Sequence, residues 1–205
     1  MAMGYVSRLG LLGGTFDPPH AAHLRLAAVA GAALGLDAVL FVPAGNPWRK
    51  RDNMVTPANQ RLAMTSAAVQ GQDGFSVSDM EMQRPGPTYT VDTLRALRDQ
   101  GYESIWFILG ADALEDLPRW HEPRELIRLA RLAVAARPGS EIDRDHLDKL
   151  VPGLAAAVDW LPVDLDTASA SDIRKDVAAG RSVADRVPTA VCAYIEKHGL
   201  YRRER

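Results

Sequence analysis

The most chemically informative part of the chain is a stretch of eleven residues, Gly13 to His23, with the sequence GGTFDPPHAAH. Its glycines allow the backbone to approach a ligand closely and to adopt positive φ angles. His20 and His23 stand three residues apart, so both imidazoles share a face if a helix begins there. The N-terminus of such a helix attracts phosphate through free N–H groups and its dipole. We therefore expect an anion site here, with both histidines as donors and, when protonated, as positive charges.

Two other interpretations of the histidine pair are open. A tight turn and a capped helix can carry two exposed histidines without any function, which is the ordinary explanation for such a pair taken alone. Two histidines can also bind zinc, but the glutamate of the zinc motif does not stand between them. The single cysteine, Cys192, excludes a cysteine-based zinc site and an internal disulfide. We expect no metal held by protein side chains.

A second segment near the C-terminus, residues 169–174, has the sequence SASDIR. Ser171 is expected to cap a helix, and Arg174 would then lie one turn further along the same face. A guanidinium group suits polyphosphate because it donates two parallel, charge-assisted hydrogen bonds. Taken alone, the segment is more typical of an ordinary capped helix with a surface arginine.

The elements that must position these residues alternate along the chain. Apolar, strand-like runs occupy residues 9–12, 38–42, 75–77, 105–109 and 132–136. Helical patterns occupy residues 21–34, 57–69 after a Thr56 cap, a stretch from Thr90, 123–129, a stretch from Ser171, and 188–197. Residues 138–160 fit no class clearly.

This alternation predicts an α/β fold: a doubly wound, mostly parallel Rossmann-like sheet with helices on both faces and a small C-terminal helical segment. Ligands of such sheets bind beyond the carboxyl ends of the strands. Three segments follow strand ends and should therefore converge on one crevice: Gly13–His23, Pro43–Lys50 and Gly110–Asp112.

Composition narrows the class further. With 205 residues, 47% of them hydrophobic and 24% charged, the chain fits one globular domain. It has no apolar run long enough to span a membrane and no leader-like start, so we expect a cytoplasmic protein without membrane contact. A net charge of -2 and a pI of about 6.2 disfavour nucleic acid as a partner. The oligomeric state stays open, and a homo-oligomer is compatible with the sequence.

Several strings resemble a known family. Residues 14–23 resemble the nucleotidylyltransferase signature G-x-F-D-P-x-H-x-x-H, and residues 169–174 resemble the C-terminal S-x-x-x-I-R element of that superfamily. The strings RPGPTYTVDTL at 84–94, GAD at 110–112 and LPRWH at 117–121 resemble the bacterial nicotinate-nucleotide adenylyltransferases. The resemblance extends from about Arg8 to Arg202. It implies transfer of the adenylyl group of ATP to nicotinate mononucleotide, giving nicotinate adenine dinucleotide and pyrophosphate, in NAD biosynthesis.

The resemblance also implies residue roles. Three residues would clamp phosphate during catalysis: His20, His23 and Arg174. Seven would bind ATP: Gly13, Gly14, Thr15, Phe16, Asp112, Ser171 and Ile173. Five would bind the acceptor: Thr88, Thr90, Trp120, His121 and Lys50. Mg²⁺ is expected to ride on the ATP phosphates. Residues 1–205 would form one nucleotidylyltransferase domain, whose part 168–205 completes the ATP site.

Structural interpretations stand beside these roles. Asp112 and Thr90 could each cap a helix, Trp120 could be a core residue, and Arg49 with Lys50 could be a solvated charge pair. Two positions depart from the family pattern, because Ala22 replaces a glycine near the phosphate path and Ala170 replaces a hydroxyl-bearing residue. These departures keep a catalytically weakened nucleotide-binding protein open. A same-fold adenylyltransferase acting on another phosphorylated acceptor, such as phosphopantetheine, is the nearest alternative.

Overall fold

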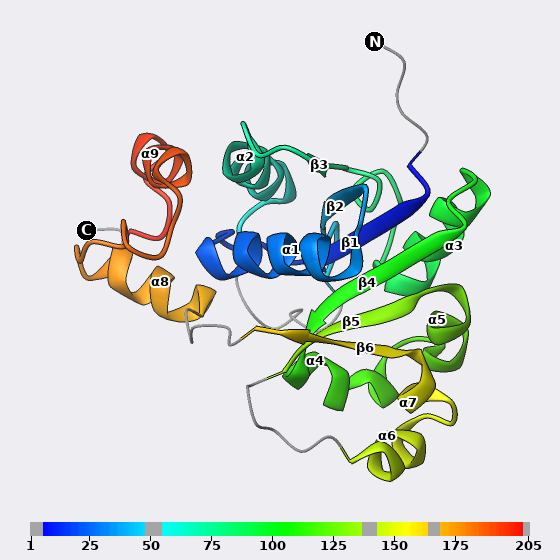
Figure 1. The fold of residues 1–205 in the computed structure, drawn as a ribbon. Coiled ribbons are helices and arrows are strands. Elements are labelled where there is room, and N and C mark those ends of the chain that lie inside the picture. The colour runs from blue at the N-terminus through cyan, green and yellow to red at the C-terminus, as the bar shows by residue number, and fades with distance from the viewer. Residues whose placement is uncertain (1–5, 48–54, 137–142, 164–168, 203–205) are drawn as a thin grey trace.

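The computed structural model describes residues 6–47, 55–136, 143–163 and 169–202. These residues form a parallel sheet of six strands in the order β3-β2-β1-β4-β5-β6 (Figure 1). The strands are β1 (Arg8–Gly14), β2 (Ala38–Pro43), β3 (Phe75–Val77), β4 (Ser104–Gly110), β5 (Arg131–Ala136) and β6 (Val158–Pro162). The direction of winding reverses between β1 and β4, the position at which ligands bind in doubly wound sheets. The predicted fold class is confirmed.

Helices cover both faces of the sheet because successive side chains of each strand point to opposite sides. One face packs against α1 (Ala21–Leu34), whose Leu26, Ala27 and Ala30 meet Leu12 and Ile108. The other face is covered by α3 (Thr90–Asp99), α4 (Ala111–Glu115), α5 (Pro123–Leu129), α6 (Arg144–Leu150) and α7 (Leu154–Ala157). A 3₁₀ turn, Leu117–Arg119, connects α4 to the loop that carries Trp120.

A third apolar cluster lies beside the sheet and holds the C-terminal helices. It joins Met64 and Ala68 of α2 (Ala58–Val69) to Ile173 of α8 (Ala170–Ala178) and to Val191 and Ile195 of α9 (Thr189–Lys197). In Figure 1, α9 stands beside α2, and α8 lies below α9. The predicted small C-terminal helical segment is therefore present.

Element boundaries agree closely with the sequence patterns, but the predicted caps do not. Thr56 is not the cap of α2, because Pro57 occupies that position. Thr90 is the first residue of α3 and follows the cap position, Tyr89. Ser169, not Ser171, caps α8, and its Oγ accepts from the Asp172 N–H at 3.1 Å. Helices α6 and α7 lie within the stretch 138–160 that the sequence did not resolve, and strand β6 begins there and ends at Pro162.

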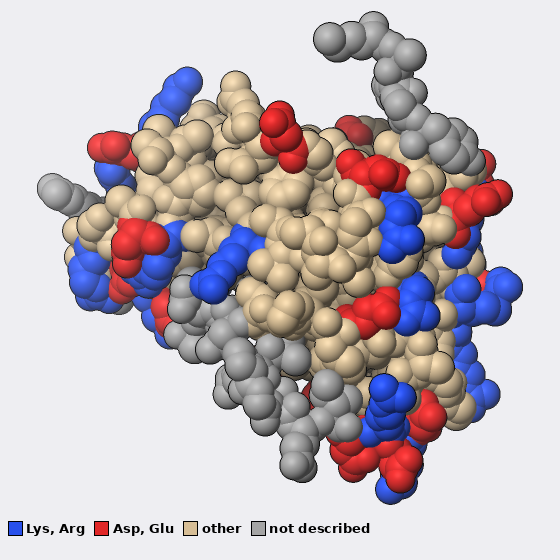
Figure 2. Space-filling model, viewed as in Figure 1, with Lys and Arg blue, Asp and Glu red and all other residues tan. Residues whose placement is uncertain are grey.

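The surface carries mixed charge on the face that Figure 2 shows, where acidic and basic side chains alternate around the rim. Few charged side chains lie over α1, whose sequence contains a single charged residue, Arg25. In the described part of the chain, no helix has the length and apolar character needed to cross a membrane.

Candidate active site

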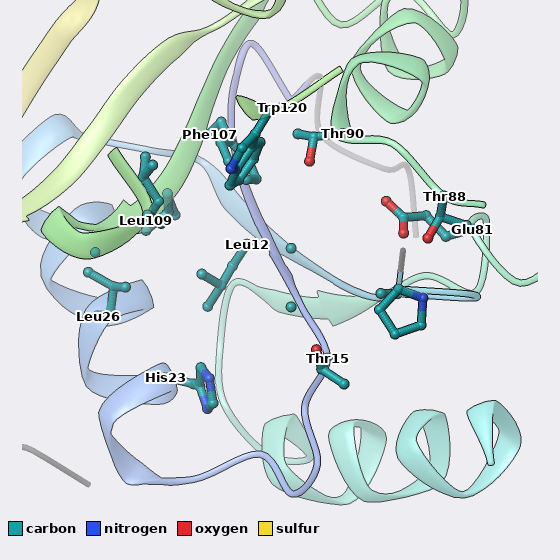
Figure 3. Close-up of a pocket in the computed structure, with 17 residues that line it drawn as sticks. Leu12, Thr15, His23, Leu26, Glu81, Thr88, Thr90, Phe107, Leu109 and Trp120 are labelled. Atoms are coloured by element: carbon teal, nitrogen blue, oxygen red, sulfur yellow. The ribbon is translucent and has the colours of Figure 1, made fainter. Parts of the chain in front are cut away.

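A cavity of about 520 Å³ opens at the carboxyl ends of β1 and β4. Gly13, Gly14 and Thr15 line it from the end of β1, and Leu109 and Gly110 line it from the end of β4. Ala44 and Pro47 line it from the segment after β2, and Glu81 and Thr88 line it from the segment before α3. The first residue of α3, Thr90, also lines it, as do Ala113 of α4 and Trp120 in the loop after the 3₁₀ turn. The predicted convergence of three strand ends on one crevice is thus confirmed (Figure 3).

The two glycines at the end of β1 lie close to aromatic rings. A Cβ at Gly14 would lie 3.1 Å from the Phe16 ring, and a Cβ at Gly13 would lie 3.3 Å from the Phe107 ring. Neither glycine has a positive φ; that conformation belongs to Phe16, at 49°. The expectation of positive φ at the glycines was therefore wrong, and close approach of their backbone to a ligand stays a prediction.

His23 lines the cavity and has a defined tautomer. The backbone N–H of His20 donates to His23 Nδ1 at 3.2 Å, so this nitrogen carries no proton. In the neutral ring the proton then resides on Nε2, which makes that atom a hydrogen-bond donor. The ring is held between Phe16, at a centroid distance of 5.0 Å, and His20, at 3.8 Å. His23 is thus built to present one donor.

His20 differs from its neighbour because it is only 6% exposed and does not line the described cavity wall. Burial lowers the pKa of His20 to about 4. The ring is therefore neutral at pH 7, and the expected positive charge is absent at this residue. Its Nδ1 has no hydrogen-bond partner among the described residues.

The N-terminus of α1 is less available to anions than the sequence suggested. Ala21 N–H donates to the Arg186 carbonyl at 2.8 Å, and His23 N–H donates to the His20 carbonyl at 3.0 Å. With the bond from His20 N–H to His23, three of the first four N–H groups of the helix have protein acceptors. Phosphate binding through free N–H groups is contradicted at these three positions.

Arg174 reaches the first motif from α8. Its Nη1 donates to the Asp17 carbonyl at 2.8 Å, across 157 residues of sequence. The predicted meeting of the two motifs is therefore seen in the structure. Ile173 beside it is 0% exposed and packs in the third apolar cluster, so only its backbone could reach a nucleotide. Ser171 is exposed and does not line the described cavity.

A buried polar network under the first motif escaped the sequence analysis. Asp17 is 3% exposed and accepts from the Tyr201 hydroxyl at 2.7 Å and from the Thr56 N–H at 3.2 Å. Arg61 is 1% exposed and donates to the carbonyls of Thr15 at 2.8 Å and of Gly45 at 3.3 Å. Arg61 thereby joins the loops after β1 and β2. The available signal was its place in the apolar stripe 61, 64, 65 and 68 of a helix.

The other end of the cavity contains most of the predicted acceptor residues. Thr88, Thr90 and Trp120 line it, and Thr88 donates from N and Oγ1 to the Asn46 carbonyl at 3.2 Å each. The Trp120 ring meets Phe107 edge-on at 5.7 Å, and its Nε1 has no partner among the described residues.

His121 and Asp112 are absent from the described cavity wall, as are Phe16, His20, Ser171, Ile173 and Arg174. His121 is exposed, stacks on Tyr89 at a centroid distance of 4.3 Å and lies 3.2 Å from Glu122. Asp112 is exposed in the first turn of α4, where Gly110 holds the cap position that had been considered for Asp112. Lys50, like Arg49, lies outside the described residues. Ala22, half-buried at the second position of α1, is also absent from the described lining.

Glu81 is a cavity residue that the sequence analysis missed. It is buried, accepts from Thr93 Oγ1 at 2.6 Å and lies 3.7 Å from Arg84. Burial raises the pKa of Glu81, whereas the hydrogen bond from Thr93 and the charge of Arg84 oppose that rise. The end of the cavity that contains the predicted substrate-binding residues is therefore lined by a carboxyl group as well as by hydrogen-bond donors.

No group of three or more His, Cys, Asp or Glu side chains in the described ranges is arranged to bind a metal ion. If Mg²⁺ enters with a nucleotide, its ligands would be the phosphate oxygens of that nucleotide.

Comparisons with known proteins agree with this geometry. The cytidylyltransferase-like family model matches residues 11–176. A protein of Thermomicrobium roseum named probable nicotinate-nucleotide adenylyltransferase is 47% identical over 96% of this chain and 92% of its own length. A protein of the same name from Roseiflexus sp. is 46% identical over 95% and 98%. A nicotinic acid mononucleotide adenylyltransferase of Plasmodium falciparum, solved with NaAD, shares the fold with a TM-score of 0.76 at 21% identity, over 95% and 97% of the two chains.

Proposed function

The chain belongs to the cytidylyltransferase-like family and to the nicotinate-nucleotide adenylyltransferases, and we propose that it transfers the adenylyl group of ATP to nicotinate mononucleotide. The products are nicotinate adenine dinucleotide and pyrophosphate. The reaction is an intermediate step of NAD biosynthesis. The observation that carries the proposal is one cavity at the β1–β4 switch point with different chemistry at its two ends. In Figure 3, His23 lies toward one end and Thr90 with Trp120 toward the other.

The reaction joins two anions without a covalent enzyme intermediate. A phosphate oxygen of the mononucleotide attacks the α-phosphorus of ATP, and the bond to the bridging oxygen of pyrophosphate breaks. The attacking phosphate is already ionised near neutral pH, so no general base is required. Catalysis then consists of alignment, which can contribute about 7–11 kcal/mol, and of stabilising the charge that grows on the leaving group.

The residues around the first motif supply that stabilisation. His23 Nε2–H is a fixed donor at the cavity wall, and Arg174 brings a permanent positive charge to Asp17 beside it. His20 serves as a neutral ring that supports His23 through stacking and through its backbone N–H. Mg²⁺ bound to the ATP phosphates would neutralise part of their charge. Residues 1–205 act as one domain in which the part from 168 completes the ATP site, and the reaction takes place in the cytoplasm, where ATP is available.

The acceptor end is assigned to the pyridine nucleotide. Trp120 offers a ring for stacking, and Thr90 with the neighbouring backbone N–H groups offers donors for the nicotinate carboxylate. A carboxamide would direct its own NH₂ toward such donors and leave them unpaired, at a cost of about 1–3 kcal/mol. We expect at least roughly tenfold higher kcat/KM for nicotinate mononucleotide than for nicotinamide mononucleotide.

The test is initial-rate kinetics at fixed Mg·ATP, in which release of pyrophosphate and formation of the dinucleotide are measured. The three acceptor substrates are nicotinate mononucleotide, nicotinamide mononucleotide and phosphopantetheine. Trp120→Ala should weaken both pyridine acceptors equally, whereas Thr90→Ala should reduce the preference for the acid. Trp106→Phe provides a control tryptophan change, because Trp106 lies in β4 and bonds Asp159 away from the cavity's acceptor end. Turnover of phosphopantetheine alone would support the same-fold alternative, and nucleotide binding without any pyrophosphate release would support a weakened, non-catalytic protein.

A further inference from the structure

The C-terminal part of the chain holds the first motif at three points. The Tyr201 hydroxyl donates to Asp17 Oδ1 at 2.7 Å, Arg174 Nη1 donates to the Asp17 carbonyl at 2.8 Å, and Ala21 N–H donates to the Arg186 carbonyl at 2.8 Å. All three contacts fall on the five residues from Asp17 to Ala21, which lead directly into the histidine pair. The histidine loop is therefore fixed by a part of the chain more than 150 residues away, the separation of Arg174 from Asp17 being 157.

The Tyr201 contact is a buried one. Asp17 is 3% exposed, and its second oxygen accepts from the Thr56 N–H at 3.2 Å. Tyr201 packs against the third apolar cluster. Burial and the hydrogen bond to Asp17 raise the pKa of Tyr201, so its hydroxyl stays protonated and remains a donor. A hydrogen bond to a buried carboxylate is among the stronger ones in proteins.

Apolar packing alone fixes the C-terminal helices less exactly. Ile173 and Val177 of α8 meet the third cluster, and α9 packs on α2. Such contacts are non-directional and tolerate small shifts of one helix along another. The polar contacts on Asp17 are directional, and they set where α8, with Arg174, stands relative to His23.

We propose that Tyr201 is a positioning residue for the ATP half of the site, acting through Asp17 to hold α8 and the histidine loop at the separation that phosphate binding requires. This inference rests on the proposed function for its kinetic consequence, but the mechanical coupling between Tyr201 and α8 does not. Tyr201 itself touches no reacting atom in this scheme. Its loss should therefore affect ATP and leave the acceptor end unchanged.

The experiment compares Tyr201→Phe with Tyr194→Phe in the full chain. Both changes remove one hydroxyl from the C-terminal segment, but the Tyr194 ring packs on His198, at 4.2 Å, and not on Asp17. We expect Tyr201→Phe to raise KM for Mg·ATP by about three- to tenfold, because small misplacements of binding groups have effects of this size or larger. KM for nicotinate mononucleotide should stay within about twofold of the wild-type value, since no acceptor residue moves. Tyr194→Phe should match the wild type in both.

A second measurement does not depend on turnover. Hydrogen exchange of the amides in α8 should be faster in Tyr201→Phe than in the wild type and in Tyr194→Phe, while exchange in β1 and β4 stays unchanged. Wild-type ATP kinetics together with unchanged α8 exchange would overturn the proposal, as would a lower melting temperature with unaltered KM for both substrates. If the wild-type protein made no dinucleotide, the proposed function would fail, and the exchange comparison would still decide the coupling.

Discussion

Different substitutions at His23 can separate the role of Nδ1 in stability from the role of Nε2 in catalysis. His23 Nδ1 accepts the His20 N–H at 3.2 Å, and the proton is thereby placed on Nε2 at the cavity wall. Asparagine places an oxygen near the Nδ1 position but does not extend to Nε2. Glutamine extends an NH₂ group to the Nε2 position but supplies no acceptor at Nδ1. The two variants therefore remove different halves of the ring's function.

The expected magnitudes follow from those contacts. Loss of a donor to developing transition-state charge typically costs about 10²–10³ in rate. Loss of a helix-capping acceptor costs about 0.5–2 kcal/mol of stability. His23→Asn should therefore lower kcat by about 10²–10³ at nearly unchanged stability. His23→Gln should lose about 1 kcal/mol of stability and retain more activity than His23→Asn. His23→Ala should show both losses.

The assay is pyrophosphate release at saturating nicotinate mononucleotide and Mg·ATP, paired with urea unfolding of each variant at the same pH. Wild-type turnover in a correctly folded His23→Asn protein would refute the reasoning, because it would show that the reaction does not use the Nε2 donor. Equal stability of all three variants would refute the capping contact instead.

Two further predictions concern the buried groups of the site. Because burial lowers the pKa of His20 from 6.5 in the unfolded chain to about 4, the unfolded state binds a proton between these values that the folded state does not. Stability should consequently fall as the pH falls from 6.5 to 4, by about 3 kcal/mol from this residue, and urea unfolding of His20→Asn should show a weaker dependence in that window. At the acceptor end, Glu81→Gln removes a negative charge beside the proposed nicotinate site, so the acid-to-amide ratio of kcat/KM should rise. A fall in that ratio would contradict the placement of the carboxylate.

The fold could be predicted because its signals are local. Buried parallel strands appear as short apolar runs, and the glycine and proline residues around them mark the turns, so the alternation alone predicted the layers. Strand β6 gave no such signal. Its sequence VDWLP contains Asp159, whose carboxylate accepts from partners distant in sequence, the indole of Trp106 at 2.8 Å and the guanidinium of Arg131 at 2.6 Å. An edge strand that depends on such contacts has no recognisable local pattern.

The predicted N-cap of α8 was also wrong. Ser169 and Ser171 are both suitable cap residues, and they stand two positions apart. The structure uses Ser169, whose Oγ accepts from the Asp172 N–H at 3.1 Å. Ser169 and Asp172 have the spacing of a capping box, a local signal for Ser169 that the sequence interpretation missed.

The electrostatic character of the site was the least predictable from sequence, because it depends on which donors the fold has already used. Two histidines at a helix N-terminus suggested positive charge and free N–H groups. In the folded chain, burial keeps His20 neutral, and the carbonyls of Arg186 and His20, with the ring of His23, occupy three N–H groups of α1. Among the described residues, the permanent positive charge brought to this motif from the C-terminal segment is therefore that of Arg174. Because Arg174 stands on a helix held to Asp17, we expect the affinity of the proposed phosphate site to depend on how firmly the C-terminal segment is attached.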